Sequence, residues 1–270
     1  MMSHSRINCF KQCPKMFEYK YIKHLFPLES SGALNLGKAF HRGIELNSAE
    51  DLAKELDESD YFTEENETEK VIALAMVEAF LKRFPNHNTP DVQHEVHIEI
   101  PIGDEIFQMY ADALKITEKG IILREYKTAS RIDVAYIDKL KFNDQISRYC
   151  VAIEKFYNKP VIGIEYYIVK KPLLRLKSNE SLEQYRERLV ERIMDEDSIV
   201  FVELSRTKED LQETYDDLVY DIDVIKNTTR YTKCLNSCST YGVCPYLSLC
   251  AKEPDADLLY IVKEEKENDK

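Results

Sequence analysis

The sequence contains no long apolar run, no apolar leader and no excess of positive charge. Because a membrane-spanning helix needs about 18 or more consecutive apolar residues, we expect no membrane span. The opening stretch, MMSHSRINCFKQC, lacks the apolar core of a signal peptide, so we expect a cytoplasmic protein. The formal net charge of −12 is not typical of a nucleic-acid-binding protein. It does not exclude one, because the local electrostatic potential decides such binding.

The composition supports one sizeable folded unit. The chain has 270 residues, of which 44% are hydrophobic and 10% aromatic, which is enough for a buried core. It shows no internal repeat, no low-complexity linker and no clean domain boundary. We therefore expect a single domain at residues 1–252 and an acidic tail at residues 253–270.

Apolar periodicity predicts a mixture of helices and strands. Helices are expected at residues 3–23 with an interruption at Pro14, from about residue 36, and at 67–84, 132–157, 181–194 and 207–226. Strands are expected at residues 92–100, 106–115, 121–128, 161–169 and 199–204. This order predicts an α/β fold in which helices flank a mixed central sheet. Its parts are a helical cap at about 1–90, a core at about 91–230 and a cysteine-rich segment at 234–250.

Residues 108–128, QMYADALKITEKGIILREYKT, are typical of two strands joined by a turn at Gly120. Side chains alternate faces along a strand, so Glu125 and Lys127 point the same way, and pairing across the turn brings Asp112 near them. Two carboxylates suit Mg²⁺ or Mn²⁺, and a lysine beside such an ion can stabilise charge on a phosphodiester. The alternative is a plain surface pattern in which Asp112 is an ordinary strand-end carboxylate.

The seven cysteines predict metal ligation rather than disulfides, because their number is odd and no secretory signal is visible. Cys234, Cys238, Cys244 and Cys250 lie within 17 residues, and thiolates select soft metals, so an iron–sulfur cluster or Zn²⁺ is indicated. Either these four form a local site, or Cys13 joins the last three and links the two ends of the chain. The spacing alone leaves both sets open, and also the alternative that the cysteines bind nothing.

Six motifs in order resemble the RecB-like nuclease domains of the PD-(D/E)xK superfamily. SRINCFKQCPKMFEYKYI resembles the opening helix of that family, and GKAFHRGIE resembles its next motif, a glycine followed by a histidine. YADAL, EYK and QISRY match its D, ExK and QxxxY motifs, and YGVCPYLSLC matches its C-terminal cysteine motif. The match spans about residues 3–250. It implies a restriction-endonuclease-like fold, and the compact length is similar to phage nucleases and to the nuclease of CRISPR spacer acquisition.

The resemblance assigns roles to individual residues. It implies that Asp112 and Glu125 bind the catalytic divalent metal, with His41 as a further ligand and the backbone carbonyl of Tyr126 completing the shell. A plain alternative for His41 is a pairing with Glu45, one turn further along the same helix.

The same resemblance implies that Lys127 is the catalytic lysine and that Gln145 and Tyr149 orient metal-bound water and substrate. For Gln145 and Tyr149, a packing face of a helix is the alternative. Basic residues also bracket the site along the chain, with scattered solvated charges as the alternative. Those expected to bind nucleic acid are Arg131, Lys170 and Lys171.

The iron–sulfur subset of the family uses one cysteine before the nuclease core and three after it, which is similar to Cys13, Cys238, Cys244 and Cys250. A [4Fe-4S] cluster would then fix the chain ends against the core. The sequence departs from the family pattern, because the five residues between Cys238 and Cys244 are more than is usual. Cys234 is therefore an alternate ligand and zinc an alternate metal.

These features predict a DNA nuclease that hydrolyses phosphodiester bonds with Mg²⁺ or Mn²⁺. We expect an exonuclease rather than an endonuclease, acting on single-stranded DNA or DNA ends in repair or recombination. The alternative is a catalytically silent nucleic-acid-binding or scaffold subunit with a structural metal site. The sequence has no GxxxxGK(S/T) phosphate loop, so a helicase partner is expected to be a separate protein. Recombination or CRISPR-adaptation proteins are further expected partners, in a bacterial or phage-infected cytoplasm.

Overall fold

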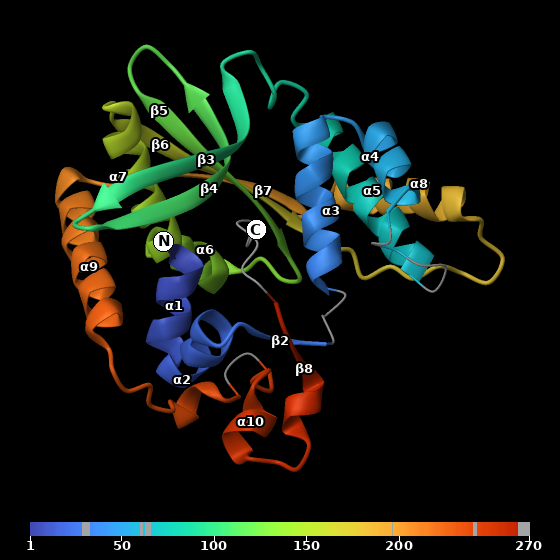
Figure 1. Cartoon of the computed structure of the whole chain (residues 1–270). Coiled ribbons are helices and arrows are strands. Elements are labelled where there is room, and N and C mark those ends of the chain that lie inside the picture. The colour runs from blue at the N-terminus through green and yellow to red at the C-terminus, as the bar shows by residue number, and fades with distance from the viewer. Residues whose placement is uncertain (29–32, 60–61, 63–65, 196, 240–241, 264–270) are drawn as a thin grey trace.

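The computed structural model describes residues 1–28, 33–59, 62, 66–195, 197–239 and 242–263 (Figure 1). A mixed six-stranded sheet forms its centre. Five of its strands follow one another across the sheet: β3 (Val92–Ile102), β4 (Glu105–Ile116), β5 (Ile121–Ala129), β6 (Val161–Lys170) and β7 (Ile199–Leu204). Neighbours run antiparallel except β5 and β6, which are parallel. The structure confirms the five expected strands and the mixed sheet.

Strands β4 and β5 separate after a short paired region. They pair only over residues 113–116 of β4 and 121–124 of β5. Nearer the other end of β4, the short strand β1 (Met2–Ser3) pairs with it in parallel. Asp112 and Glu125 lie at the first positions beyond the paired region, where the two backbones are no longer joined by the ladder.

The turn between β4 and β5 forms at the expected glycine. Thr117 Oγ1 donates a hydrogen bond to the carbonyl of Gly120 at 2.7 Å. A Cβ atom at Gly120 would lie 2.6 Å from the carbonyl oxygen of Pro160, so a larger residue would push the turn away from the start of β6. The glycine therefore allows the turn to lie close to the start of β6.

Helices cover both faces of the sheet and create two hydrophobic cores (Figure 1). One core contains side chains of α1 (His4–Gln12), α7 (Asp144–Tyr157) and α9 (Lys208–Asn227). The other contains side chains of α3 (Ala33–Leu46), α4 (Ala49–Asp57), α5 (Glu67–Arg83) and α8 (Leu182–Ile193). The residues expected to form one helical cap are therefore divided, because α1 packs on one face and α3 to α5 pack on the other. No helix in the described part of the chain is long and apolar enough to span a membrane.

Two expected helices are interrupted. The first consists of α1, α2 (Pro14–Phe17) and a π-helix (Glu18–Ile22), with the break at Pro14 that the sequence indicates. The helix expected at residues 132–157 is divided into α6 (Val134–Lys141) and α7. The division occurs because the side chain of Asn143 accepts a hydrogen bond from the backbone N–H of the third residue beyond it and starts a new helix.

The C-terminal segment returns to the N-terminal one. Strand β8 (Tyr260–Val262) pairs antiparallel with β2 (Leu25–Pro27). Tyr260 donates a hydrogen bond to the carbonyl of Pro245 at 2.6 Å, and its ring stacks on Tyr246. Residues 256–262 of the expected acidic tail form a 3₁₀-helix and a strand. The rest of that tail, residues 264–270, lies outside the described residues.

Candidate active site

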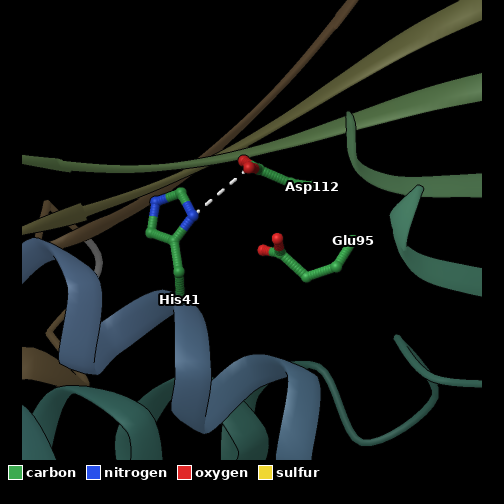
Figure 2. A group of neighbouring side chains, drawn as sticks. All are labelled: His41, Glu95 and Asp112. Carbon is green, nitrogen blue, oxygen red and sulfur yellow. Dashed lines mark ion pairs between the residues drawn. The ribbon is translucent and has the colours of Figure 1, made fainter. Parts of the chain in front are cut away.

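Asp112 lies at the centre of the candidate site, where β4 and β5 separate (Figure 2). Its Oδ2 accepts a hydrogen bond from the backbone N–H of Tyr126 at 2.8 Å, and its Oδ1 lies 3.3 Å from Nδ1 of His41. His41 projects from α3, so this helix contributes a side chain to the region where β4 and β5 are not paired. Glu45 instead forms an ion pair with Arg42 at 2.6 Å, and the alternative pairing of His41 with Glu45 is therefore wrong.

Glu125 and Lys127 point the same way along β5, as their spacing predicts. The Lys127 ammonium forms an ion pair with Oε1 of Glu125. Glu125 is only 2% exposed, and its Oε2 has no hydrogen-bond partner. A buried carboxylate oxygen without a partner is costly, so this oxygen faces a position that suits a cation. The alternative of a plain surface pattern is wrong for Glu125, because the side chain is buried.

The charged groups of the site perturb one another. Burial raises the pKa of the Glu125 carboxyl, and the Asp112 carboxylate raises it further. Burial acts on Asp112 in the same direction, but His41, Lys127 and the Tyr126 N–H together lower its pKa. Burial opposes the charged forms of His41 and Lys127, yet the two carboxylates raise the pKa of both. Two close carboxylates with one lysine form a site of excess negative charge, which a divalent cation would offset.

Helix α7 contributes a polar pair to the same region. Gln145 Nε2 donates a hydrogen bond to the hydroxyl of Tyr149 at 3.1 Å. Burial raises the pKa of Tyr149 to about 12, although the bond from Gln145 lowers it, and the carboxylates of Glu125 and Asp112 raise it further. Tyr149 is therefore a neutral hydroxyl within electrostatic reach of the carboxylates. It is 8% exposed, so it also packs in the core beneath α7.

One acidic residue of the site was not expected from the sequence. Glu95 on β3 lies opposite Asp112, between two paired positions of the β3–β4 ladder, with a φ of +49°. One ligand atom each from His41, Glu95 and Asp112 lie within 4.8 Å of one another (Figure 2). The sequence showed only an alternating strand here. A prediction of the β3–β4 register would have been needed to identify Glu95 as a residue of the site.

The expected nucleic-acid-binding residues lie at or just beyond the ends of β5 and β6. Lys170 is paired in register with Ala129, and the backbone N–H of Lys171 donates to the Ala129 carbonyl at 2.8 Å. Lys170, the last residue of β6, thus lies level with the last residue of β5, and Lys171 follows it. Arg131 follows the same end and is exposed. Arg124, which belongs to the same basic group along the chain, is buried and bonded to a glutamate of β6, so it has a structural role instead.

The cysteines at the two ends of the chain meet around one cavity of about 180 Å³. The cysteines that line it are Cys13, Cys234, Cys238, Cys244 and Cys250. The backbone N–H of Cys234 donates to Sγ of Cys13 at 3.4 Å, and the hydroxyl of Ser237 donates to Sγ of Cys234 at 3.3 Å. The remaining lining includes Met16 and Leu247, so the sulfurs face a largely apolar space.

Comparisons with known proteins give a family match and similar solved structures. The model of the PD-(D/E)XK nuclease superfamily matches residues 1–251. The crystal structure of "Putative exonuclease" from Eubacterium rectale is similar with a TM-score of 0.56 at 14% identity, covering 98% of this chain and 90% of that one. The structure of SSO0001 is similar with a TM-score of 0.38 at 12% identity, covering 92% of this chain and 96% of that one. No curated protein matches the sequence.

The first of these structures shows a shared fold, and the family model covers nearly the whole chain. The mixed sheet with helices on both faces is accordingly a restriction-endonuclease-like fold. The site at Asp112 lies within the matched residues. The chain therefore belongs to the PD-(D/E)XK nuclease superfamily.

Proposed function

We propose that this protein is a metal-dependent deoxyribonuclease that acts as an exonuclease on single-stranded DNA or DNA ends. The observation that supports this most is the convergence of Asp112, Glu125 and Lys127 where β4 and β5 separate, with a buried oxygen of Glu125 left without a partner. Carboxylate oxygens and an imidazole are donors that fit Mg²⁺ or Mn²⁺.

Each group would have a distinct part in hydrolysis. Asp112 and Glu125 would hold the divalent cation, with His41 and the Tyr126 carbonyl as further ligands. When bound, the cation supplies an activated water and offsets charge on the phosphodiester. Lys127 keeps its proton, since the two carboxylates raise its pKa, and its ammonium can stabilise negative charge that develops on the phosphate.

The neutral Tyr149 and its partner Gln145 would orient water and substrate on the α7 side of the site. The hydrogen bond between them fixes the direction of the hydroxyl. Because burial holds the pKa of Tyr149 near 12, the hydroxyl remains a donor at neutral pH.

The distribution of positive charge supports a single strand as substrate. The net charge of −12 argues against a broad duplex-binding surface. Lys170 lies level with the last residue of β5, and Lys171 and Arg131 follow the same strand ends, which would give a narrow basic path that leads to Lys127. The similar Eubacterium rectale structure bears the name of an exonuclease, which agrees with attack at ends.

The test is cleavage of single- and double-stranded DNA labelled at the 5′ or 3′ end, with Mg²⁺, Mn²⁺ or EDTA. The wild type should shorten linear single strands only with metal, and Glu125→Gln should lose at least about a hundredfold in rate. Glu203→Gln, a matched change on β7, should keep the full rate. Cleavage in EDTA, or an active Glu125→Gln, would contradict the assignment. Cleavage of circular single-stranded DNA would contradict the exonuclease action.

We propose in addition that the cysteine cavity holds a [4Fe-4S] cluster. Cysteines from both ends of the chain line this one cavity, and thiolates are the ligands that hold iron–sulfur clusters. An N–H···S bond to Cys13 is the kind of contact that tunes a cluster ligand.

Anaerobic purification tests the cluster. A brown protein with iron and sulfide is expected, and Cys13→Ser or Cys244→Ser should lose both. Cys150→Ser is the matched control, because Cys150 lies on α7 in the core of the sheet and does not line the cavity. A colourless protein that contains zinc would contradict the cluster.

A further inference from the structure

Tyr166 on β6 is a buried polar residue to which the proposed hydrolysis gives no part. Its side chain is 0% exposed, and its hydroxyl has no hydrogen-bond partner among the described residues. Burying a hydroxyl without a hydrogen bond is costly, whereas phenylalanine would fill the same space without that cost. The hydroxyl therefore points to a polar contact in this part of the core.

The strand register places Tyr166 beside Glu125. The two residues are partners in the parallel β5–β6 pair, as are Leu123 and Ile164, two positions earlier. Paired residues lie on the same face of a sheet, in strands about 4.8 Å apart. Leu123 and Ile164 lie in the core beneath α7 together with Tyr166. Because side chains alternate along β5, Glu125 projects from that same face.

The two side chains present a donor and an acceptor that are both unpartnered. Burial raises the pKa of the Tyr166 hydroxyl, and the Glu125 carboxylate raises it further, so the hydroxyl keeps its proton at neutral pH. Oε1 of Glu125 is paired with Lys127, while its Oε2 is buried and has no partner in the described part of the chain. Arg206 also acts on the hydroxyl, but a guanidinium has no acceptor atom, and its Nε already donates to Ser147 at 2.9 Å. The carboxylate of Glu125 is therefore the acceptor that fits.

We propose that Tyr166 is a positioning residue, whose hydroxyl donates to Oε2 of Glu125 through one buried water. A water that joins a buried donor to a buried acceptor satisfies both atoms. A carboxylate oxygen has two lone pairs, so Oε2 can accept from this water and still bind a cation. The bridge would hold the carboxylate in the orientation that the cation requires. This role rests on the metal-dependent function proposed above.

The test is the affinity of the full chain for Mn²⁺, measured from the electron paramagnetic resonance signal of free Mn²⁺ during a titration. Tyr166→Phe removes only the hydroxyl. It should raise the Kd for Mn²⁺ at least about tenfold, because that is the usual effect of losing a group that orients a metal ligand. Tyr167→Phe is the matched control, because this tyrosine lies in the other core and its hydroxyl donates to Glu165 at 3.1 Å. The control should keep the wild-type Kd, and an unchanged Kd in Tyr166→Phe would overturn the proposal.

The stability of the metal-free chain gives a second readout. In EDTA, loss of the bridge leaves the Glu125 oxygen without a donor, so Tyr166→Phe should unfold at a lower urea concentration than the wild type. An idle hydroxyl predicts the opposite, because phenylalanine removes a buried polar group that has no partner. An equal or higher urea midpoint in Tyr166→Phe would therefore also overturn the proposal.

These results separate the role of Tyr166 from the nuclease function. A wild type that binds Mn²⁺ and cleaves DNA, with an unchanged Kd in Tyr166→Phe, would refute the role of Tyr166 and keep the nuclease. A weaker Kd in Tyr166→Phe, with a wild type that binds Mn²⁺ but leaves DNA intact, would keep the role and refute the nuclease. If the wild type binds no Mn²⁺, the metal-dependent function is refuted, and the urea midpoints in EDTA still decide whether Tyr166 supports Glu125.

Discussion

Replacing Glu125 by glutamine tests whether this side chain is a metal ligand or only one half of a structural ion pair. The carboxylate is 2% exposed, and one of its oxygens has no partner. Glutamine keeps an oxygen that can accept from Lys127, and Asp112 remains to hold the charge of that ammonium. Without metal, we therefore expect the free energy of unfolding of the variant to lie within about 1 kcal/mol of the wild-type value, although the side chain is buried.

The metal-bound proteins should differ clearly. At a Mn²⁺ concentration one hundred times the Kd, binding stabilises the folded chain by about 2.7 kcal/mol. An unfolding entropy of about 2.1 cal/mol/K per residue gives about 0.57 kcal/mol/K for 270 residues, so the wild-type Tm should rise by about 5 °C. If Glu125→Gln weakens binding a hundredfold, the same Mn²⁺ concentration should raise its Tm by less than about 1 °C.

The assay is thermal unfolding followed by circular dichroism with EDTA and with Mn²⁺, for the wild type, Glu125→Gln and Glu203→Gln. Glu203→Gln should keep the full Mn²⁺ effect. The reasoning is refuted if Glu125→Gln loses about 3 kcal/mol or more in EDTA while its Mn²⁺ shift stays at the wild-type value, since a buried ion pair behaves in that way.

Three further predictions follow from the same structure. Lys127→Met should bind Mn²⁺ but cleave DNA about 10²–10³-fold more slowly in single-turnover assays, because its ammonium no longer stabilises the phosphate; an unchanged rate would exclude that role. Burial lowers the pKa of His4 to about 4, so as the pH falls the unfolded chain is protonated at this residue before the folded chain is. The free energy of unfolding should therefore decrease between pH 6.5 and pH 4, by up to about 3 kcal/mol. Urea unfolding at pH 7 and 4.5 should show a smaller loss for His4→Gln, and equal losses would contradict this. Phe80 is fully buried with the rings of Tyr126 and Tyr167 within 5.7 Å, so Phe80→Ala should cost about 3–5 kcal/mol in urea unfolding, and a cost below about 1 kcal/mol would show that the core does not depend on it.

Neighbouring residues were sufficient to predict the elements that build the site. The break at Pro14 and the turn at Gly120 depend on the proline ring and on turn-forming residues between two strands, which are local effects. Alternation along β5 likewise placed Glu125 and Lys127 on the same side. The β4–β5 hairpin then brings Asp112 to them, because residues joined by a tight turn have little freedom in how they pair.

Features that join distant parts of the chain needed the tertiary structure. Glu95 enters the site only through the register of β3 on β4, and the sequence of either strand alone does not contain that register. The burial of Arg124 depends on a glutamate from β6, and the strand formed by residues 260–262 depends on β2, far along the chain. Periodicity and spacing determine which side chains share a face. Which of those faces meet is decided by packing and strand pairing between segments that are remote in the sequence.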